Sequence, residues 1–456
     1  MIAGMSTAFS YLPLGFFLTL LLYSFSVITQ RNIGVSAVII TTLTFVLASP
    51  DVINSEVPLS SMFNVTVLNM TIGAVLVGLC TLLSVLLLLQ APSLPRESTG
   101  LLLFLSFLLW PLFYGILYNP FNSNLIQDFV LFFACPFVAL AVSKKVKAEE
   151  IFATMISILI ASFIIQFLLH RWVAEQVVVG SGFMYFADST RNLAPIIMAP
   201  FVFSVFQKNA FDWKEFLIFA LGAIVMVNAT SRTTVVVFIL MCLFLFATQF
   251  SLAMLVRGLI ASGFLAVVIC ALVPSESYFM WKVTSIVSAD SLDITTRDSQ
   301  SSMVRVYELL NIYSHGIENG TLLLGGGFGG GVSDKAFPFM HMLYGTTSYP
   351  DSWIDQGIFF KPHLSILNVL QKAGIVGLVL FIIFNALLIF KLLRLRRNRK
   401  LAFCFAVALA ICCFKLFSLR MGVYYSLSLA GALSILFTFN SCRKEIKPLA
   451  FAEEPG

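Results

Sequence analysis

Long apolar segments make up most of this sequence, and they leave few folds open to it. Hydrophobic residues account for 59% of the 456 residues and charged residues for only 11%, which is more apolar surface than a soluble domain can bury. About thirteen segments are long enough to cross a hydrocarbon core of about 30 Å, and each should be a helix because lipid offers exposed peptide groups no hydrogen-bonding partner. The predicted spans are residues 7–29, 33–49, 66–90, 100–117, 127–143, 149–169, 192–206, 214–228, 231–249, 256–273, 364–390, 401–418 and 422–440.

One long polar stretch, Val273 to Lys361, interrupts this pattern. We therefore expect an all-α, polytopic membrane helix bundle with one large loop outside the membrane. About ten helices would form an N-terminal bundle over residues 1–273, and about three more would follow with a tail over residues 362–456. The loop between them, residues 274–361, should contain short helices and most of the polar chemistry.

Lysine and arginine set the expected orientation. They cluster at Lys144–Lys147, at Lys391–Lys400 and at Arg443–Lys447, and short loops rich in these residues stay on the cytoplasmic side. Thirteen spans are consistent with all three clusters facing the cytoplasm, so the long polar stretch should face outward. The net charge of +6 is then a topology signal and gives no reason to expect a nucleic-acid partner.

The cysteines indicate neither a disulfide framework nor a metal site. Cys442 lies beside the basic tail, and the long polar stretch contains no cysteine. We therefore expect no metal ion and no other cofactor. The remaining cysteines lie in apolar runs: Cys80, Cys135, Cys242, Cys270, Cys404, Cys412 and Cys413.

Several basic residues fall on the outer face, against the usual bias. A guanidinium binds phosphate oxygens in a bidentate manner and keeps its charge, so arginines that converge there would suit an anionic ligand. Pairing with nearby acidic residues or lipid headgroups is the alternative for each one, although their number favours a site. The residues concerned are Arg171, Arg191, Arg232, Arg305, Arg420 and His363.

Two of these arginines have an informative local setting. Arg191 follows Asp188 and Ser189, either of which can cap a helix. The arginine would then lie at the N-terminus of that helix, the positive end of its dipole, where a cation is unfavourable unless an anion binds beside it. Arg232 lies in a short polar segment between two short apolar runs, which predicts a tight outer hairpin with the arginine at its tip. A snorkelling surface arginine is the alternative for Arg232.

Arg305 lies in a segment that is predicted to be a helix inside the outer loop, ending at Gly316. Apolar residues recur along this segment at helical spacing, so we expect that stripe to face the bundle or the membrane interface. Arg305 would then project from the flank of the helix and reach a headgroup. The possible N-caps are Asp298, Ser299 and Ser301, and the apolar stripe is Met303, Tyr307, Leu310 and Tyr313.

His363 follows Pro362 at the start of the predicted helix 364–390. Proline at the first helical position would place the imidazole in the first turn. The helix dipole there favours the neutral ring, which is the form a general base needs at neutral pH. A purely structural histidine is the alternative, and His315 and His341 are weaker candidates for the same role.

The run Gly325–Gly331 has two interpretations. It is either a flexible linker or a turn whose free N–H groups approach a phosphate or a sugar. A nucleotide loop is excluded because the run lacks the Gly-Lys-Ser/Thr ending.

Three segments resemble the O-antigen polymerase and ligase superfamily of bacterial envelope glycosyltransferases. They are the small residue before an arginine at Ser231-Arg232, the arginine helix leading to a Gly-Phe-Gly turn at Arg305–Gly331, and the histidine that opens a Leu-rich helix at His363. The family's His-Asn pair is His363-Leu364 in this chain. The similar order and spacing cover residues 231–380, and elsewhere only the hydropathy agrees.

This resemblance implies a metal-independent, inverting glycosyl transfer from an undecaprenyl pyrophosphate-linked donor at the periplasmic face of the bacterial inner membrane. A departing diphosphate develops charge that fixed cations stabilise, and an acceptor hydroxyl needs a base. The further partners would be membrane lipid, a flippase and a chain-length regulator. The implied roles are pyrophosphate binding for Arg232, Arg305 and Arg191, general base for His363, and possible glycan contacts for Arg171, Gly327 and Gly329.

Within this family the sequence favours a polymerase. Arg171 to Gly182 and Arg305 to Gly316 both match the Arg-x10-Gly pattern of polymerase loops, and a ligase that transfers glycan to lipid A core is the alternative. A flippase or other transporter is a second alternative. A transporter should show internal repeats and charges or broken helices at the midplane, but the only obvious charge deep in a predicted span is Lys415.

Overall fold

The computed structural model describes residues 66–67, 70–71, 98–119, 123–153, 155, 194–206, 212–228, 238–240, 297–343, 349, 351–395, 399–415 and 419–449. This part of the chain is mostly helical, as the predicted all-α class requires. Three of its helical segments are long and apolar enough to cross a membrane: Thr99–Tyr118, Asn124–Lys144 and Ser365–Arg394. The total of about thirteen spans and the side that the loop faces stay predictions.

Helices lie where the described apolar segments predict them. The first of them are α5 (Thr99–Tyr118), α6 (Ser123–Phe129), the π-helical turn η3 (Val130–Ala134), α7 (Cys135–Lys145), α9 (Ala194–Phe206) and α10 (Trp213–Asn228). The C-terminal ones are α16 (Ser365–Arg394), α17 (Arg399–Lys415) and α18 (Leu419–Leu449). The predicted span 66–90 is wrong at its start, where Thr66–Val67 (β1) pairs antiparallel with Met70–Thr71 (β2). The β-branched residues in these two strands favour an extended backbone.

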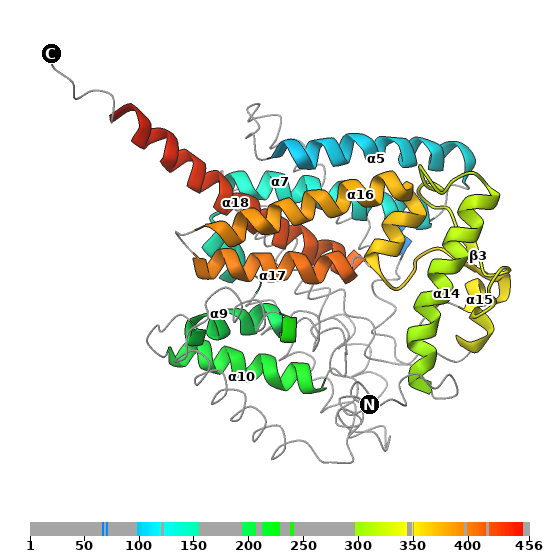
Figure 1. Ribbon diagram of the computed structural model, residues 1–456, viewed down its shortest axis with the longest axis horizontal. Coiled ribbons are helices and arrows are strands. Elements are labelled where there is room, and N and C mark those ends of the chain that lie inside the picture. The colour runs from blue at the N-terminus through cyan, green and yellow to red at the C-terminus, as the bar shows by residue number, and fades with distance from the viewer. Residues whose placement is uncertain are drawn as a thin grey trace.

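The long helices form a bundle (Figure 1). α16 lies between α5 and α17, α18 packs on both α17 and α7, and α9 joins α17 to α10. The core between them is almost entirely apolar, with Leu108, Leu140, Phe405 and Tyr425 fully or almost fully buried. Because these helices are apolar on most sides, they also leave large apolar side chains exposed, which suits contact with lipid. The exposed ones on α5 and α16 include Leu103, Trp110, Phe113, Leu117, Ile382, Ile383, Leu387 and Phe390.

The helix α14 (Arg297–Glu318) stands across one end of this bundle, as Figure 1 shows. It packs on α16 and on the short elements that follow it, and a second apolar core forms there around Phe339 and Phe359. Those elements are β3 (Val332–Ser333), η6 (Met340–Leu343), α15 (Asp351–Gln356) and β4 (Ile358–Phe359), with β3 and β4 paired antiparallel.

The helix predicted around Arg305 is confirmed, but its buried face and its end differ from the prediction. Tyr313, expected in the buried stripe, is 53% exposed. The buried face includes two polar residues, Glu308 and Asn311. Glu308 contacts His363, and Asn311 exchanges hydrogen bonds with the backbone of Phe337. A stripe defined by apolar residues alone misses a face of this kind. The helix also continues past Gly316 to Glu318. The residues buried on this face are Val304, Glu308, Asn311 and Ile312.

A break in α16 ties the loop after α14 to the bundle. Gly374 has φ 67° and ψ −169°, which interrupts the helical hydrogen bonds. The loop after α14 enters this break. On the C-terminal side of the break, the N–H groups of residues 375 and 376 donate to the loop carbonyls of Leu322 and Leu323 at 3.0 and 3.2 Å. On the N-terminal side, the carbonyls of residues 371 and 372 accept from the loop N–H groups of residues 326 and 327 at 2.9 and 3.1 Å. Both broken ends of the helix are therefore paired with protein, as a helix in an apolar environment requires.

Candidate functional site

His363 and Glu308 form the centre of the candidate site. Glu308 lies on α14 and its side chain is fully buried, whereas the side chain of His363, just before α16, is 23% exposed. Nδ1 of His363 lies 2.6 Å from Oε1 of Glu308, and the backbone N–H of His363 donates to Oε2 at 3.2 Å. One carboxylate therefore fixes both the ring and the backbone of this histidine.

Tyr349 completes the hydrogen bonding of Glu308. Its hydroxyl donates to Oε1 of Glu308, and its oxygen lies 3.3 Å from Nδ1 of His363. Burial, together with the charge of Glu308 and the hydrogen bond to it, raises the pKa of Tyr349 well above 10. The phenol therefore keeps its proton and stays a donor to the carboxylate at any physiological pH.

This arrangement selects one tautomer of His363. An ionised carboxylate can only accept hydrogen bonds, so Nδ1 carries the proton in the contact with Glu308. In the neutral ring, Nε2 then holds the lone pair and is the atom that can take a proton. A carboxylate at Nδ1 also stabilises the imidazolium that forms when Nε2 is protonated. The pair thus has the chemistry of an oriented general base.

The position of His363 relative to α16 differs from the prediction. We expected the imidazole in the first turn of a helix, under the influence of the helix dipole, but α16 begins at Ser365 with Leu364 as its N-cap. His363 therefore precedes the cap, and its N–H group bonds to Glu308. The physical reason is that a buried carboxylate 55 positions earlier in the chain supplies an acceptor that no local pattern reveals.

Arg305 lies one turn before Glu308 on α14 and belongs to the same site. Its guanidinium is close enough to Tyr349 to lower the pKa of that phenol, although burial and Glu308 outweigh it. The two residues predicted as the pyrophosphate ligand and the base, Arg305 and His363, are therefore brought together around Glu308 and Tyr349. The other arginines predicted to bind the ligand, Arg171, Arg191 and Arg232, lie outside the described residues.

Sequence reasoning missed Glu308 and Tyr349. One signal for Glu308 was present, because an acidic residue three positions after Arg305 shares its side of a helix. Tyr349 gave no local signal, because its partners lie 41 and 14 positions away in the chain.

The glycine run is a docking element. The N–H of Gly327 donates to the carbonyl of residue 372 at 3.1 Å, and the N–H of Gly329 donates to Oδ2 of Asp128 at 2.8 Å. These N–H groups are therefore occupied, and the expectation that they are free to approach a phosphate or sugar is wrong. A glycan contact through other atoms of Gly327 or Gly329 stays a prediction. Phe328, between them, is fully buried and its ring stacks on Phe132 at 5.5 Å.

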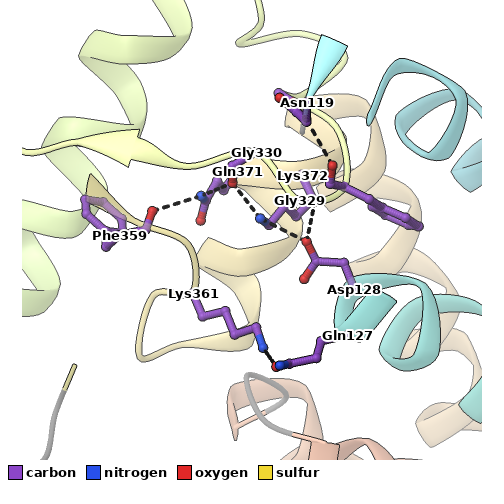
Figure 2. Close-up of polar contacts among 11 residues, drawn as sticks. Asn119, Gln127, Asp128, Gly329, Gly330, Phe359, Lys361, Gln371 and Lys372 are labelled. Carbon is purple, nitrogen blue, oxygen red and sulfur yellow. Dashed lines mark hydrogen bonds and ion pairs between the residues drawn. The ribbon is translucent and has the colours of Figure 1, made fainter. Parts of the chain in front are cut away.

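A buried ion pair fastens the same run (Figure 2). Nζ of Lys372 lies 2.9 Å from Oδ2 of Asp128 and donates to the carbonyl of Gly330 at 2.6 Å. Both charged side chains are fully buried within predicted spans, so the expectation that Lys415 would be the only charge deep in a span is wrong. A charged pair and a broken helix are features of transporters. Here, however, the glycine run binds both of them, so these groups hold the loop.

Lys361 joins this cluster from the segment that leads to His363. Its ammonium group donates to the side-chain oxygen of Gln127, as Figure 2 shows. Burial lowers the pKa of Lys361 from 10.5 to about 8, an effect that the charge of Asp128 opposes and that of Lys372 reinforces. The contact with Gln127 anchors the segment two residues before the base.

Within the described part of the chain, no group of three or more His, Cys, Asp or Glu side chains is arranged to hold a metal ion. Comparison of the sequence with protein-family models and with curated proteins finds no match.

Proposed function

We propose that this protein is a polysaccharide polymerase, which joins undecaprenyl pyrophosphate-linked oligosaccharide repeat units at the periplasmic face of the bacterial inner membrane. The observation that carries the proposal is the contact between Glu308 and His363, with Arg305 one turn away. An oriented base beside a fixed guanidinium is what transfer of a glycosyl group from a diphosphate to an alcohol requires.

The proposed reaction needs no metal. Nε2 of His363 takes the proton of an acceptor hydroxyl, and the hydroxyl oxygen attacks the anomeric carbon of the donor from the face opposite the leaving group. The bond between that carbon and the pyrophosphate oxygen breaks, so the configuration inverts and the electron pair leaves with the undecaprenyl pyrophosphate. Arg305, with Arg232 and Arg191 by prediction, balances the charge of the leaving group, and Glu308 stabilises the imidazolium.

A ligase that transfers the same glycan to lipid A core would use the same base and the same arginines. The two activities differ only in the acceptor, and the Arg-x10-Gly segments favour the polymerase. A transporter receives less support. The loop after α14 bonds to the break in α16, and the glycine run bonds to the buried pair of Asp128 and Lys372, so both features hold the loop.

Reconstitution tests this proposal. Purified protein in lipid vesicles should convert lipid-linked repeat units into a ladder of polymers, and chelator should leave the reaction unchanged. His363→Ala should reduce the rate about a hundredfold or more, and Arg305→Ala should abolish polymerisation. Arg305→Lys should restore it only in part, because an ammonium cannot form the bidentate contact. Tyr313→Ala, an exposed position on the same helix, is the matched control.

The same proposal makes a prediction in cells. A deletion strain should carry single, capped repeat units on its surface, whereas loss of a flippase would leave them facing the cytoplasm. A reporter fused after Ser333 should lie in the periplasm. A cytoplasmic reporter would place the site and its donor on opposite sides of the membrane. Full activity of Arg305→Ala would show that this arginine does not bind the pyrophosphate, and either result would refute the assignment.

A further inference from the structure

A second feature of the outer region is a cleft of about 190 Å³ beside the C-terminal half of α14. The end of α5, the last turns of α14, the glycine run and the first half of α16 surround it. Glu308 and His363 are not among its lining residues, and Glu308 lies further toward the start of α14.

Aromatic rings form one wall of the cleft. Tyr114 and Tyr118 lie one turn apart on α5, with ring centroids 4.6 Å apart. Tyr118 is 72% exposed, so its ring face is accessible. Aromatic faces of this kind pack against the C–H groups of a sugar ring, because they offer apolar area at little cost in conformational entropy.

Neutral polar groups also line the cleft. Asn319 and Thr321 follow the end of α14, and Gln371 lies on α16. Gln371 is 5% exposed, and its Nε2 donates to the carbonyl of Gly330, but its Oε1 has no hydrogen-bond partner. A buried carbonyl oxygen without a donor is costly, but this atom is enclosed by protein, so the side chains that offer hydrogen bonds to a ligand are Asn319 and Thr321.

The described lining of the cleft contains no Asp, Glu, Lys or Arg. His315 is its one titratable imidazole, and burial lowers its pKa, an effect that Glu318 opposes. His315 is therefore neutral at neutral pH. A pyrophosphate would find no fixed cation in this cleft, whereas hydroxyl groups would find both donors and acceptors. The chemistry of the lining thus fits an uncharged saccharide.

The position of the cleft indicates which saccharide it would hold. Arg305, Glu308 and His315 follow one another along α14, and His315 lies seven residues beyond Glu308, about 10 Å further along the axis. Along the axis of α14, the cleft therefore lies on one side of Glu308 and of the base that it binds. Arg305, whose guanidinium would hold the donor pyrophosphate, lies on the other side. We propose that this cleft binds the glycan of the acceptor and directs its hydroxyl toward His363. This inference rests on the proposed polymerase function.

A binding experiment tests the cleft without the reaction. The probe is the repeat-unit oligosaccharide released from its lipid by mild acid, which carries neither pyrophosphate nor lipid. It is titrated into the full-length protein in lipid nanodiscs. Tyr118→Ala should raise its Kd about tenfold, equivalent to about 1.4 kcal/mol, and Asn319→Ala should weaken binding as well. Tyr118→Phe keeps the ring and should bind as the wild type does, and so should Tyr313→Ala, which lies on α14 outside the cleft.

The kinetic result should separate the cleft from the base. Tyr118→Ala should raise KM for the acceptor and leave kcat nearly unchanged, whereas His363→Ala should lower kcat and leave the Kd of the oligosaccharide unchanged. If Tyr118→Ala binds the oligosaccharide as tightly as the wild type, or if the wild type does not bind it, the cleft is not the acceptor site, even where polymer is made. If the oligosaccharide binds through Tyr118 but no polymer forms, the cleft stands and the polymerase assignment fails.

Discussion

Replacement of Glu308 by glutamine gives the sharpest test of the site, because it changes charge and hydrogen bonding with almost no change in shape. Oε1 of Glu308 faces Nδ1 of His363 at 2.6 Å, and Oε2 faces the backbone N–H of the same residue at 3.2 Å. An amide has only one oxygen to serve these two positions, so either orientation of the new side chain spoils one contact.

The first orientation places the amide nitrogen at Nδ1 of His363. Nδ1 must then accept, which moves the ring proton to Nε2, the atom that has to take the proton of the acceptor. The other orientation places the amide nitrogen against the backbone N–H, two donors facing each other inside a buried pocket. In both cases the stabilising charge beside the imidazolium is lost. A hydrogen bond to a charged group contributes about 1.5–3 kcal/mol, so kcat should fall about 10- to 150-fold.

The assay is the rate of polymer formation by purified protein from lipid-linked repeat units. Glu318→Gln is the matched control, because Glu318 lies on the same helix but is exposed and accepts only from Ser314 in the described contacts. The control should keep the wild-type rate. Thermal unfolding of each variant reports whether the fold is intact. A Glu308→Gln protein that is folded and retains its kcat would show that Glu308 does not orient the base.

Two further predictions concern the loop and its anchors. Gly325 has φ +86°, and a β-carbon there would lie 2.2 Å from the carbonyl oxygen of residue 372, so Gly325→Ala should destabilise the protein by about 2–5 kcal/mol. Gly320 has φ +66°, and a β-carbon added there would have no atom within 4 Å, so Gly320→Ala should cost only about 1–2 kcal/mol. Equal losses of stability in the two variants, measured by thermal unfolding, would contradict the docked loop. The pKa of Lys361 is lowered from 10.5 to about 8 in the folded protein. Between these two pH values the unfolded chain holds this proton and the folded chain does not. The stability of the wild type should therefore rise as the pH increases from about 8 toward 10.5. Lys361→Met should lack this rise, and melting curves with the same pH dependence in both proteins would argue against burial of the ammonium group.

The sequence predicts the described apolar helices because lipid permits few alternatives to a helix. Apolar segments such as 100–117 and 364–390 can satisfy their peptide groups only as helices, and those helices are present. Arg305 and His363 were also predicted to act together, and the structure places Arg305 on α14 one turn before Glu308, the residue that binds His363. For Arg171, Arg191 and Arg232 the prediction still stands untested.

The partners of these residues could not be predicted because they depend on contacts between distant segments. Glu308 looks like an ordinary exposed residue of an amphipathic helix until His363 and Tyr349 enclose it. The glycine run looks like a flexible linker until the break at Gly374 receives it. In both cases a pattern along the chain gives the residue types, and only packing decides which polar groups face each other.

The loop inserted into α16 also sets the order in which the protein can become active during synthesis. α14 and the loop leave the ribosome before α16, so Glu308 exists for a time without His363, and the loop without the helix that it enters. Until the loop docks, the interrupted helix carries peptide groups that lipid cannot satisfy. The contact between Glu308 and His363 should therefore form only when the C-terminal helices have been integrated, and under the proposed function a half-made chain could not act on membrane-bound glycans.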